Sequence, residues 1–432
     1  MGQNPPVDDL AAWLFGAVSL WGAWFTWNAH RPSRRWHLLA LSFFAAWFTG
    51  ELALWHLAWQ AVGVAVFVAA GALEHWPGWV GLVVTAASWV GLVRLAVEAR
   101  QAAGVIDATL RDDLGLGNQP LERRIPLRQL LVPLYLRDRR VERVRNLRYG
   151  PAGRRNLCDV YRPAGGPDRP APVLLQVHGG AWMVGSKDQQ GLPLMLELAA
   201  SGWVCVAANY RLSPRVRWPE HLVDLKRALA WIRTHIADFG GDPTRVHVTG
   251  GSAGGHLAAM LALTAGDPRF QPTFEEVDTS VRSCVPFYGV YDLTTLFEGT
   301  GRAARLAERF QRLLMGTSLA EAPERFRDAS PITHVGPDAP PFFVIHGDAD
   351  NLVPVAQARA FVAALRAAGA APVCYAEIPG ASHAFDVFHS VRTANAVHGV
   401  RLFLEWVEQM GAGGARAHPG AGIGYKEAGN DG

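Results

Sequence analysis

The sequence predicts an α/β protein: a mainly parallel, doubly wound sheet of about eight strands, preceded by an apolar helical region. Two observations predict the sheet. Strand patterns alternate with helical patterns between about residues 141 and 410, and motifs of glycine, serine, aspartate and histidine follow the strands. A third observation predicts the helical region: three stretches before residue 98 are almost wholly apolar, and 11 of the 16 tryptophans precede that residue.

Length and composition limit the classes of protein to consider. A chain of 432 residues is long for one domain and suggests two units. The net charge of +3 is small and implies neither nucleic-acid binding nor another strongly charged partner. The four cysteines are scattered and form no Cys/His cluster, so no metal site is predicted.

Three apolar stretches are candidate membrane spans: residues 10–29, 36–73 and 78–97. About 20 apolar residues suffice to cross a bilayer as a helix, and tryptophans near the ends fit an interfacial belt. The second stretch is too long for one span and should break near Gly50-Glu51 or His56, which gives three or four spans in all. The alternative is a soluble, all-helical subdomain.

The arginines bear on the orientation in the membrane. Arg31, Arg34 and Arg35 indicate that the first loop is cytoplasmic by the positive-inside rule. Residues 94–148 hold twelve arginines against seven acids, which favours the same side. Both segments are cytoplasmic only if the chain crosses three times, whereas four crossings would place the α/β domain outside. We expect a multi-pass protein of the cell membrane, and the positive-inside rule slightly favours a cytoplasmic α/β domain.

Composition divides the chain into four parts. Residues 1–103 form the helical region, and residues 104–140 form a polar, Arg-rich connector. The connector is either a juxtamembrane helix on anionic lipid or a solvated linker. Residues 141–410 form the α/β domain, and residues 411–432 form a Gly- and Ala-rich tail that we expect to be disordered.

Periodicity predicts the elements of the α/β domain. The expected strands are 141–148, 156–161, 172–177, 203–208, 245–249, 283–288, 341–346 and 372–378. The expected helices are 190–201, 219–238, 253–265, 355–369 and 388–410. No helical pattern separates the first two strands, so they should form an antiparallel edge. The insertion at 291–332 is either a lid or a surface helix pair.

The most informative motif, at residues 250–254, is Gly-Gly-Ser-Ala-Gly. A β-rich run at 246–249 precedes it and a helical run at 256–261 follows it. This is the strand, sharp turn and helix of a nucleophile elbow, which exposes a serine hydroxyl. Glycines are needed there because strand and helix approach closely. Ser252 is therefore the candidate nucleophile, the alternative being an ordinary strand-to-helix turn.

A second motif supplies candidate backbone donors. The strand at 173–177 ends in His-Gly-Gly-Ala-Trp. Glycines after a strand expose backbone N–H groups, which an oxyanion hole requires. We expect the N–H groups of Gly180 and Ala253 to form the hole, with Gly179 or Ala181 as a neighbour.

Two later strands end in an acid and a histidine. The strand at 342–345 ends in His-Gly-Asp-Ala-Asp, which places Asp348 and Asp350 at the edge of the sheet. The strand at 375–378 leads into a glycine-containing loop that carries His383. The order of serine, acid and histidine is that of α/β-hydrolases, and all these motifs follow strand ends, where such sheets bind ligands.

Residues from about 145 to 408 resemble the bacterial esterase/lipase group of α/β-hydrolases related to hormone-sensitive lipase, and most closely the membrane-associated Lip-type carboxylesterases of actinobacteria. The matching stretches are Asp-Val-Tyr-Arg-Pro at 159–163, His-Gly-Gly-Ala-Trp at 178–182, Asn-Tyr-Arg-Leu-Ser-Pro at 209–214, Gly-Gly-Asp-Pro at 240–243, residues 250–256, and the motifs of Asp350 and His383. The resemblance implies an α/β-hydrolase fold and hydrolysis of carboxylic esters without a cofactor.

The resemblance also assigns roles, with two departures from the group's pattern. It implies a triad in which Ser252 attacks, His383 moves the proton and an aspartate orients the imidazole. Ala181 replaces the third glycine of the lipase motif but keeps its N–H. The acid motif reads His-Gly-x-x-Asp-x-x-Val-Pro, so Asp350 is expected as the acid and Asp348 is the alternative.

Aromatic residues near these motifs are candidates for an ester-binding pocket, the alternative being that they belong to the core: Trp182, Tyr210, Tyr288 and Phe385. His178 is expected to structure its loop, for example by bonding a neighbouring carbonyl, and His346 is expected to be structural.

Motifs and resemblance together predict a serine carboxylesterase acting on small-molecule or lipid-derived acyl esters through an acyl-enzyme. The helical region would hold the enzyme at a membrane. Amide hydrolysis by the same triad, as in formamidases and peptidases, is the alternative among hydrolases. A membrane scaffold with a vestigial hydrolase fold is the alternative outside enzymes, and the intact serine, acid and base disfavour it.

Overall fold

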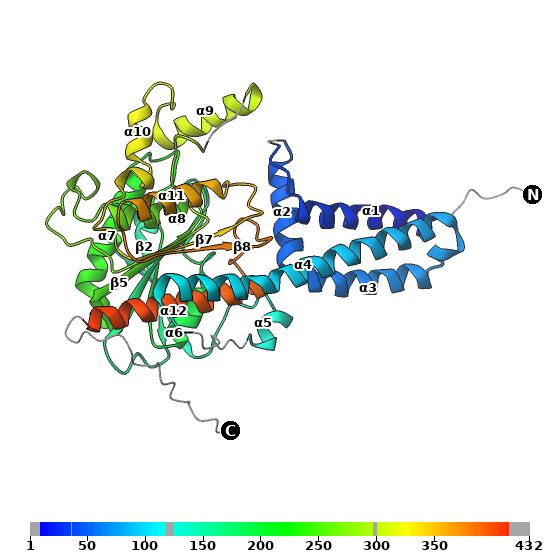
Figure 1. Ribbon diagram of the computed structural model, residues 1–432, viewed down its shortest axis with the longest axis horizontal. Helices are drawn as coiled ribbons and strands as arrows, with labels where there is room; N and C mark the ends of the chain where they lie inside the picture. Colours follow the sequence, from blue (N-terminus) through cyan, green and yellow to red (C-terminus); the bar gives the residue numbers. More distant parts are fainter. Residues whose placement is uncertain (1–8, 36, 118–124, 297–299, 414–432) are drawn as a thin grey trace, which may run out of the picture.

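The computed structural model describes residues 9–35, 37–117, 125–296 and 300–413 of the chain. A helical region built from the first hundred residues projects from an α/β domain (Figure 1). One continuous helix, α4 (Trp76–Leu114), runs through the helical region and along the α/β domain.

Within the described residues, one eight-stranded sheet organises the α/β domain, in the order β1-β2-β4-β3-β5-β6-β7-β8. Its strands are β1 (Val141–Arg148), β2 (Leu157–Pro163), β3 (Ala171–Val177), β4 (Val204–Ala208), β5 (Gly241–Gly251), β6 (Cys284–Phe287), β7 (Phe342–Gly347) and β8 (Val373–Ile378). β1 and β4 pair with β2 antiparallel, and the remaining pairs are parallel. The predicted eight strands and antiparallel edge are confirmed, and the carboxyl ends of the parallel strands meet at one rim.

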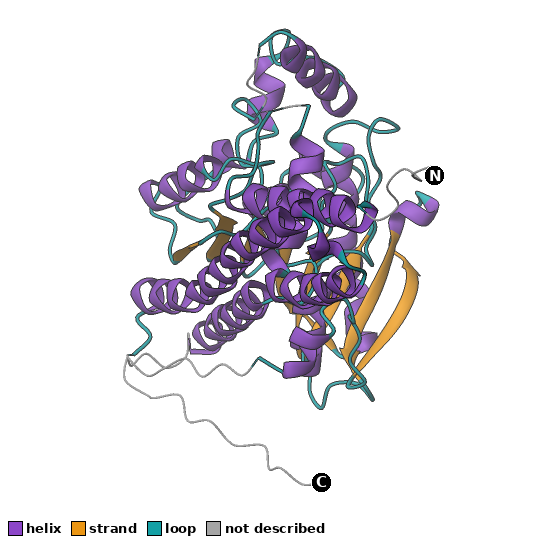
Figure 2. Ribbon diagram, turned by 90° about the vertical axis from the view of Figure 1, so that its right-hand side faces the viewer, coloured by secondary structure: helices purple, strands orange, loops and turns teal. Residues whose placement is uncertain are grey.

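Helices cover both faces of the sheet, as a doubly wound fold requires. One buried cluster joins the sheet to α7 (Glu220–His235), α8 (Ala253–Leu263) and α11 (Ala356–Ala367). A second cluster, on the other face, joins it to α6 (Leu192–Ala200), α12 (Val391–Gly413) and the end of α4. Seen from the side of the helical region, helices lie in front of the strands (Figure 2).

Shorter elements connect these layers. They are α5 (Leu127–Leu131) and the 3₁₀ helices η1 (Ala72–Glu74), η2 (Gly153–Asn156), η3 (Ile236–Phe239), η4 (Pro268–Phe270) and η5 (Pro331–His334). The insertion at 291–332 contains α9 (Arg302–Met315) and α10 (Pro323–Asp328), which lie outside the sheet layers (Figure 1).

Three helices of the helical region lie side by side, and a fourth crosses their ends. α1 (Leu10–His30) and α3 (Ala53–Ala69) accompany the first half of α4, and α2 (Leu39–Glu51) lies across them beside the α/β domain (Figure 1). α2 and α3 meet at 91°, which confirms the predicted break near Gly50-Glu51. α1 and α4 are each long and apolar enough to cross a membrane, and the bent α2–α3 pair would be a third candidate.

The interior of the helical region is small and polar, whereas its outer surface is apolar. Thr26 Oγ1 and Ser88 Oγ are 2.8 Å apart, and Thr85 donates to Ser19 at 2.9 Å. Large side chains such as Trp21 are exposed on the outside. Small residues and hydroxyls thus lie between the helices, and large apolar side chains lie on the outside.

α4 does not end where the sequence analysis placed the end of the helical region, at residue 103. It continues to Leu114, and Ala102, Ile106 and Leu110 are completely buried against the second face of the sheet. The start of the Arg-rich connector is thus part of the core, because apolar residues at intervals of four form one face of the helix. Of the predicted connector, 118–124 lie outside the described residues, as does the predicted tail beyond 413.

Candidate active site

The turn between β5 and α8 holds Ser252 in a strained conformation. Its φ of 60° and ψ of −123° lie outside the regions that non-glycine residues prefer. A Cβ on Gly254 would lie 2.2 Å from the carbonyl oxygen of Val177, and one on Gly250 would lie 2.4 Å from that of Gly254. The turn can therefore form only with glycines at these positions, and it lifts the Ser252 side chain out of both elements.

The segment after β3 provides backbone N–H groups beside this turn. The Gly179 N–H donates to Gln190 Oε1 at 2.7 Å, so Gly179 is not a free donor, contrary to one of the predicted options. In the part of the chain that the structure describes, no hydrogen bond occupies the N–H groups of Gly180, Ala181 or Ala253. Three of the four predicted donors are thus available.

His178 and Tyr210 hold that segment in place through hydrogen bonds to its backbone. The His178 ring bonds the Gly179 carbonyl through Nδ1 at 2.8 Å, as expected, and stacks on Tyr210 with ring centroids 4.4 Å apart. The Tyr210 hydroxyl donates to the His178 carbonyl at 2.9 Å. Burial lowers the pKa of His178 to about 4, so the ring is neutral. Tyr210 is completely buried, which corrects its predicted place in the ester-binding pocket.

The Asp350 carboxylate, after β7, is bonded through both oxygens. Oδ1 accepts the N–H groups of Leu352 and Val353 at 2.8 and 2.9 Å. Oδ2 lies 2.6 Å from His383 Nδ1 and 3.3 Å from His346 Nε2. Burial alone would raise the pKa of Asp350, but the charge of His383 and the hydrogen bonds from both histidines hold this pKa well below its usual range.

The alternative acid, Asp348, points elsewhere. It is exposed and accepts the Gly380 N–H at 2.7 Å, and partial burial raises its pKa. The contact of His346 with Asp350 was missed in the sequence analysis, which took this histidine as structural only. Its position four residues before the acid was the available signal.

The His383 ring is bonded to Asp350 and packs against Tyr288. Because an ionised Asp350 can only accept, His383 Nδ1 carries the proton and Nε2 is left as a base. The centroid of the His383 ring is 4.7 Å from that of Tyr288. Tyr288 directly follows Phe287, and the Phe287 carbonyl accepts the Ser252 N–H at 3.0 Å. Among the described residues no hydrogen bond joins Ser252 Oγ to the imidazole, a contact that in hydrolases often tightens only with substrate.

The other predicted pocket residues divide into two kinds. Tyr288 faces His383 and donates its hydroxyl to the buried Asp386. Phe385 is completely buried in the second core cluster and does not line a pocket, which corrects the prediction.

Trp182, after the oxyanion segment, is connected to the insertion. Its indole donates to His256 Nδ1 at 3.2 Å, and His256 Nε2 in turn bonds the Ala329 carbonyl at 2.7 Å. The Phe310 ring of α9 lies 6.4 Å from the Trp182 ring. The insertion therefore approaches the site through Trp182.

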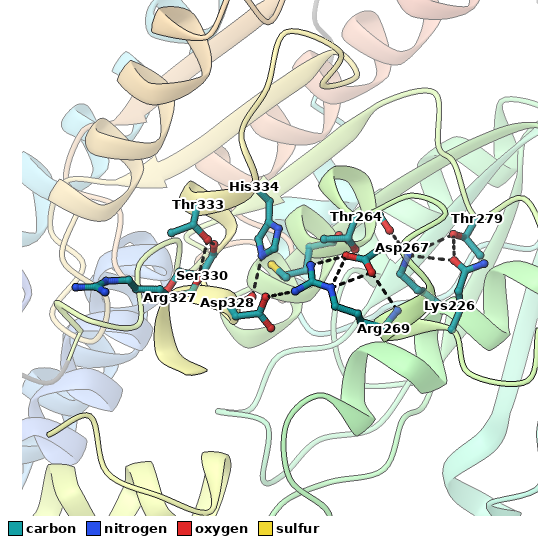
Figure 3. A network of polar contacts seen from close by, with 12 residues as sticks. Lys226, Thr264, Asp267, Arg269, Thr279, Arg327, Asp328, Ser330, Thr333 and His334 are labelled. Atoms are coloured by element: carbon teal, nitrogen blue, oxygen red, sulfur yellow. Dashed lines mark hydrogen bonds and ion pairs between the residues drawn. The ribbon is translucent and has the colours of Figure 1, made fainter. Parts of the chain in front are cut away.

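A polar network fixes the second half of the insertion to the domain (Figure 3). Arg269 binds Asp267 and Asp328 at 2.6 Å each, and His334 Nε2 bonds the Asp328 carbonyl at 2.7 Å. Lys226, whose pKa burial lowers to about 8, lies 3.3 Å from Thr279 Oγ1 at the other end of the network. This cluster anchors α10 and η5 to the domain.

A cleft of about 680 Å³ lies where the helical region meets the acid loop. The cleft is lined by the acid loop, at Asp348, Ala349 and Asp350, and by the helical region, which includes Arg34 and Arg94. Neither Ser252 nor His383 is among the lining residues, so this cleft is not the place where an ester would meet the serine.

Comparisons with known proteins agree with this fold. The BD-FAE family description matches residues 158–365. The Mycobacterium tuberculosis protein named "Probable carboxylic ester hydrolase LipM" is 43% identical over 80% of this chain and 82% of its own length. Esterase B from Lactobacillus rhamnosis superposes with a TM-score of 0.55 at 20% identity, over 74% of this chain and all of that one, and shares the fold. Thermogutta terrifontis esterase 2, solved after phosphonylation by sarin, superposes with a TM-score of 0.51 at 27% identity, over 62% of this chain and 94% of that one.

A relative this similar over most of both chains shows the family. The chain is a carboxylic ester hydrolase with an α/β-hydrolase fold, and it belongs to the Lip-type carboxylesterases of the hormone-sensitive-lipase family.

Proposed function

We propose that the α/β domain hydrolyses carboxylic esters through a triad of Ser252, His383 and Asp350. The observation that carries this proposal is the 2.6 Å contact between His383 Nδ1 and Asp350 Oδ2, beside a serine held in a strained turn. Asp350 keeps the proton on Nδ1, so Nε2 accepts the Ser252 proton as Oγ attacks the ester carbonyl. The imidazolium then returns this proton to the leaving alcohol, and water releases the acid from the acyl-enzyme by the same steps.

The negative charge that develops on the carbonyl oxygen is stabilised by backbone N–H groups. Gly180 and Ala253 supply the donors, with Ala181 beside them, because their N–H groups are not otherwise occupied. Each such donor contributes on the order of 3 kcal/mol to stabilising the transition state. Tyr288, whose ring faces His383, and Trp182, after the oxyanion segment, border the site.

The helical region places this chemistry at the cell membrane, with α1, α3 and α4 as three crossings. Residues 70–78, at the end far from the α/β domain, contain no lysine or arginine, and neither does the sequence of residues 1–9, whereas Arg31, Arg34 and Arg35 lie at the near end. By the positive-inside rule the near end and the α/β domain are cytoplasmic. A green fluorescent protein fused after residue 432 should fluoresce, and an alkaline phosphatase at that position should be inactive.

The test of the enzymatic proposal uses the full-length protein in detergent. The related T. terrifontis esterase reacts with an organophosphorus compound, so a fluorophosphonate probe is suitable. We expect the probe to label the wild type and not Ser252→Ala, and a panel of p-nitrophenyl esters to be hydrolysed faster than the matching anilides. Faster anilide cleavage would indicate an amidase, and no labelling of the wild type would indicate a scaffold.

The same ester panel addresses the substrate class. A site at the cytoplasmic face of a membrane meets acyl esters that partition into the bilayer. We therefore expect kcat/KM to rise with acyl length. A preference for acetate over every longer chain would contradict a lipid-derived substrate.

A further inference from the structure

Helix α2 of the helical region lies directly against the proposed catalytic base. The Phe43 ring meets the His383 ring edge to face, with centroids 6.2 Å apart and planes at 70°. The imidazole is also bonded to Asp350, and the Tyr288 ring centroid lies 4.7 Å from its own. Phe43 therefore forms one of the walls that limit the orientation of the imidazole.

A buried ion pair fixes α2 to the segment that carries His383. Arg392 Nη1 lies 3.2 Å from Glu51 Oε1, and both side chains are almost completely buried. Glu51 Oε2 also accepts the Ser390 hydroxyl at 2.7 Å, and Arg392 Nε donates to the Pro379 carbonyl at 2.9 Å. Pro379 and Ser390 lie on either side of His383 in the chain, so both ends of this segment are tied to the end of α2.

Aromatic packing continues the contact along α2. Trp47 and Phe48 both lie on Phe388, with ring centroids 5.2 and 6.0 Å apart. Phe43, Trp47 and Glu51 are spaced by four residues, so they share one face of the helix. From Phe43 to Glu51 that face packs against residues 379–392, the histidine segment, which carries His383.

The loop before α2 reaches the acid in the same way. Arg34 Nη2 donates to the Asp350 carbonyl at 3.1 Å, and Asn351 Nδ2 donates to the Ser33 carbonyl at 3.1 Å. The two members of the proposed acid–base pair are therefore both contacted by residues 33–51, which precede the α/β domain by about a hundred positions.

We propose that α2 and its preceding loop are a positioning element of the active site, in which Phe43 sets the His383 imidazole and Arg34 supports the Asp350 loop. The inference rests on the proposed triad. The helical region then has two roles, attachment to the bilayer and alignment of the acid–base pair. Groups that hold a catalytic imidazole in place commonly affect kcat strongly, because small displacements of a reacting group are costly.

The first test compares two neighbouring phenylalanines in the full-length protein. Phe43→Ala should lower kcat for p-nitrophenyl acetate about tenfold or more, with KM nearly unchanged, and should slow fluorophosphonate labelling to the same extent. Phe44→Ala removes the same ring from an exposed position and should leave both rates unchanged. Phe43→Leu keeps an apolar wall and should recover most of the loss.

A second comparison tests the contact between Arg34 and the Asp350 carbonyl. Arg34→Gln should lower kcat severalfold, whereas Arg35→Gln, one residue later, should not. Wild-type rates in both Phe43→Ala and Arg34→Gln would overturn the inference, as would an equal loss in Phe44→Ala, which would indicate general damage to α2. Neither result affects the proposed triad, which fails only if the wild type does not react or Ser252→Ala remains active.

Discussion

At the scale of single residues, Asp350 has the most demanding surroundings, because both its oxygens are bonded and both partners of Oδ2 are histidines. Asp350→Asn preserves the shape of the side chain, but an amide can donate as well as accept. It therefore no longer keeps the proton on His383 Nδ1. The wrong tautomer leaves Ser252 without a base, and kcat should fall about ten-thousandfold. Steady-state kinetics on a p-nitrophenyl ester would measure this loss.

The neighbouring acid is the matched control for that experiment. Asp348 is exposed and bonds only the Gly380 N–H among the described residues, so Asp348→Asn should retain kcat within about twofold. If Asp348→Asn lost activity and Asp350→Asn kept it, the assignment of the acid would be reversed.

Two buried histidines predict how stability depends on pH. Burial lowers the pKa of both His178 and His256 to about 4, against about 6.5 in an unfolded chain. Between these values the unfolded chain binds more protons, so stability is lost as pH falls from about 6.5 toward about 4. Each histidine contributes a slope of about 1.4 kcal/mol per pH unit across this window.

Urea unfolding at several pH values would measure this slope. His256→Gln should lower stability at pH 7, because it disturbs the Trp182 and Ala329 contacts, but should make the pH dependence shallower. His235→Gln, at an exposed position, should leave the slope as it is. An unchanged slope in His256→Gln would show that its imidazole is already protonated in the folded protein.

Sequence motifs located the strand-end residues, but not what surrounds them. Glycine spacing alone indicated the turn at Ser252, because the steric need is local. That Gln190 occupies the Gly179 N–H, or that Phe43 contacts His383, could not be predicted, because these pairs meet only after the chain folds. Tyr210 and Phe385 were misplaced for the same reason, since aromatic residues near a motif can face the core as readily as the site.

At the scale of elements, the close crossing of β3 with the β5–α8 turn makes Gly254 sensitive. A Cβ there would meet the Val177 carbonyl at 2.2 Å, so Gly254→Ala must displace either the strand or the helix. We expect a loss of stability on the order of 3 kcal/mol, together with activity. Thermal unfolding in detergent and probe labelling would report the two effects.

Gly104 is the control for this substitution. Gly104 is an exposed residue in the middle of α4, and a Cβ added there would have no atom within 4 Å. Gly104→Ala should therefore stabilise the protein by about 0.8 kcal/mol, the usual gain of alanine over glycine in a helix. A similar loss in both variants would argue against steric conflict at the turn.

Periodicity predicted the strands well because each is short, apolar and bounded by turn residues. It failed at the end of α4, where composition changes at residue 103 but the helix does not stop. The polar residues of that segment, such as Arg111 and the exposed Asp112, concealed the buried face formed by Ala102, Ile106 and Leu110. Composition reports the average of a helix, whereas burial depends on which face each residue occupies.

At the scale of the whole molecule, the helical region and the α/β domain share both a helix and a boundary. α4 belongs to both, Thr109 donates to the Tyr375 carbonyl at 3.0 Å, and α2 closes over the histidine segment. Removing the helical region therefore removes contacts to the segments that carry His383 and Asp350, as well as the candidate membrane spans.

A chain beginning at residue 104 puts this to the test. It loses Phe43 and removes Glu51, the ion-pair partner of Arg392, so it should be less stable than the full chain and at least tenfold slower on p-nitrophenyl acetate, an ester that needs no bilayer. Arg392→Met in this shortened chain removes the unpaired charge and should restore much of the stability, measured by thermal unfolding, but not the rate. Full activity of the shortened chain would mean that the helical region serves attachment alone.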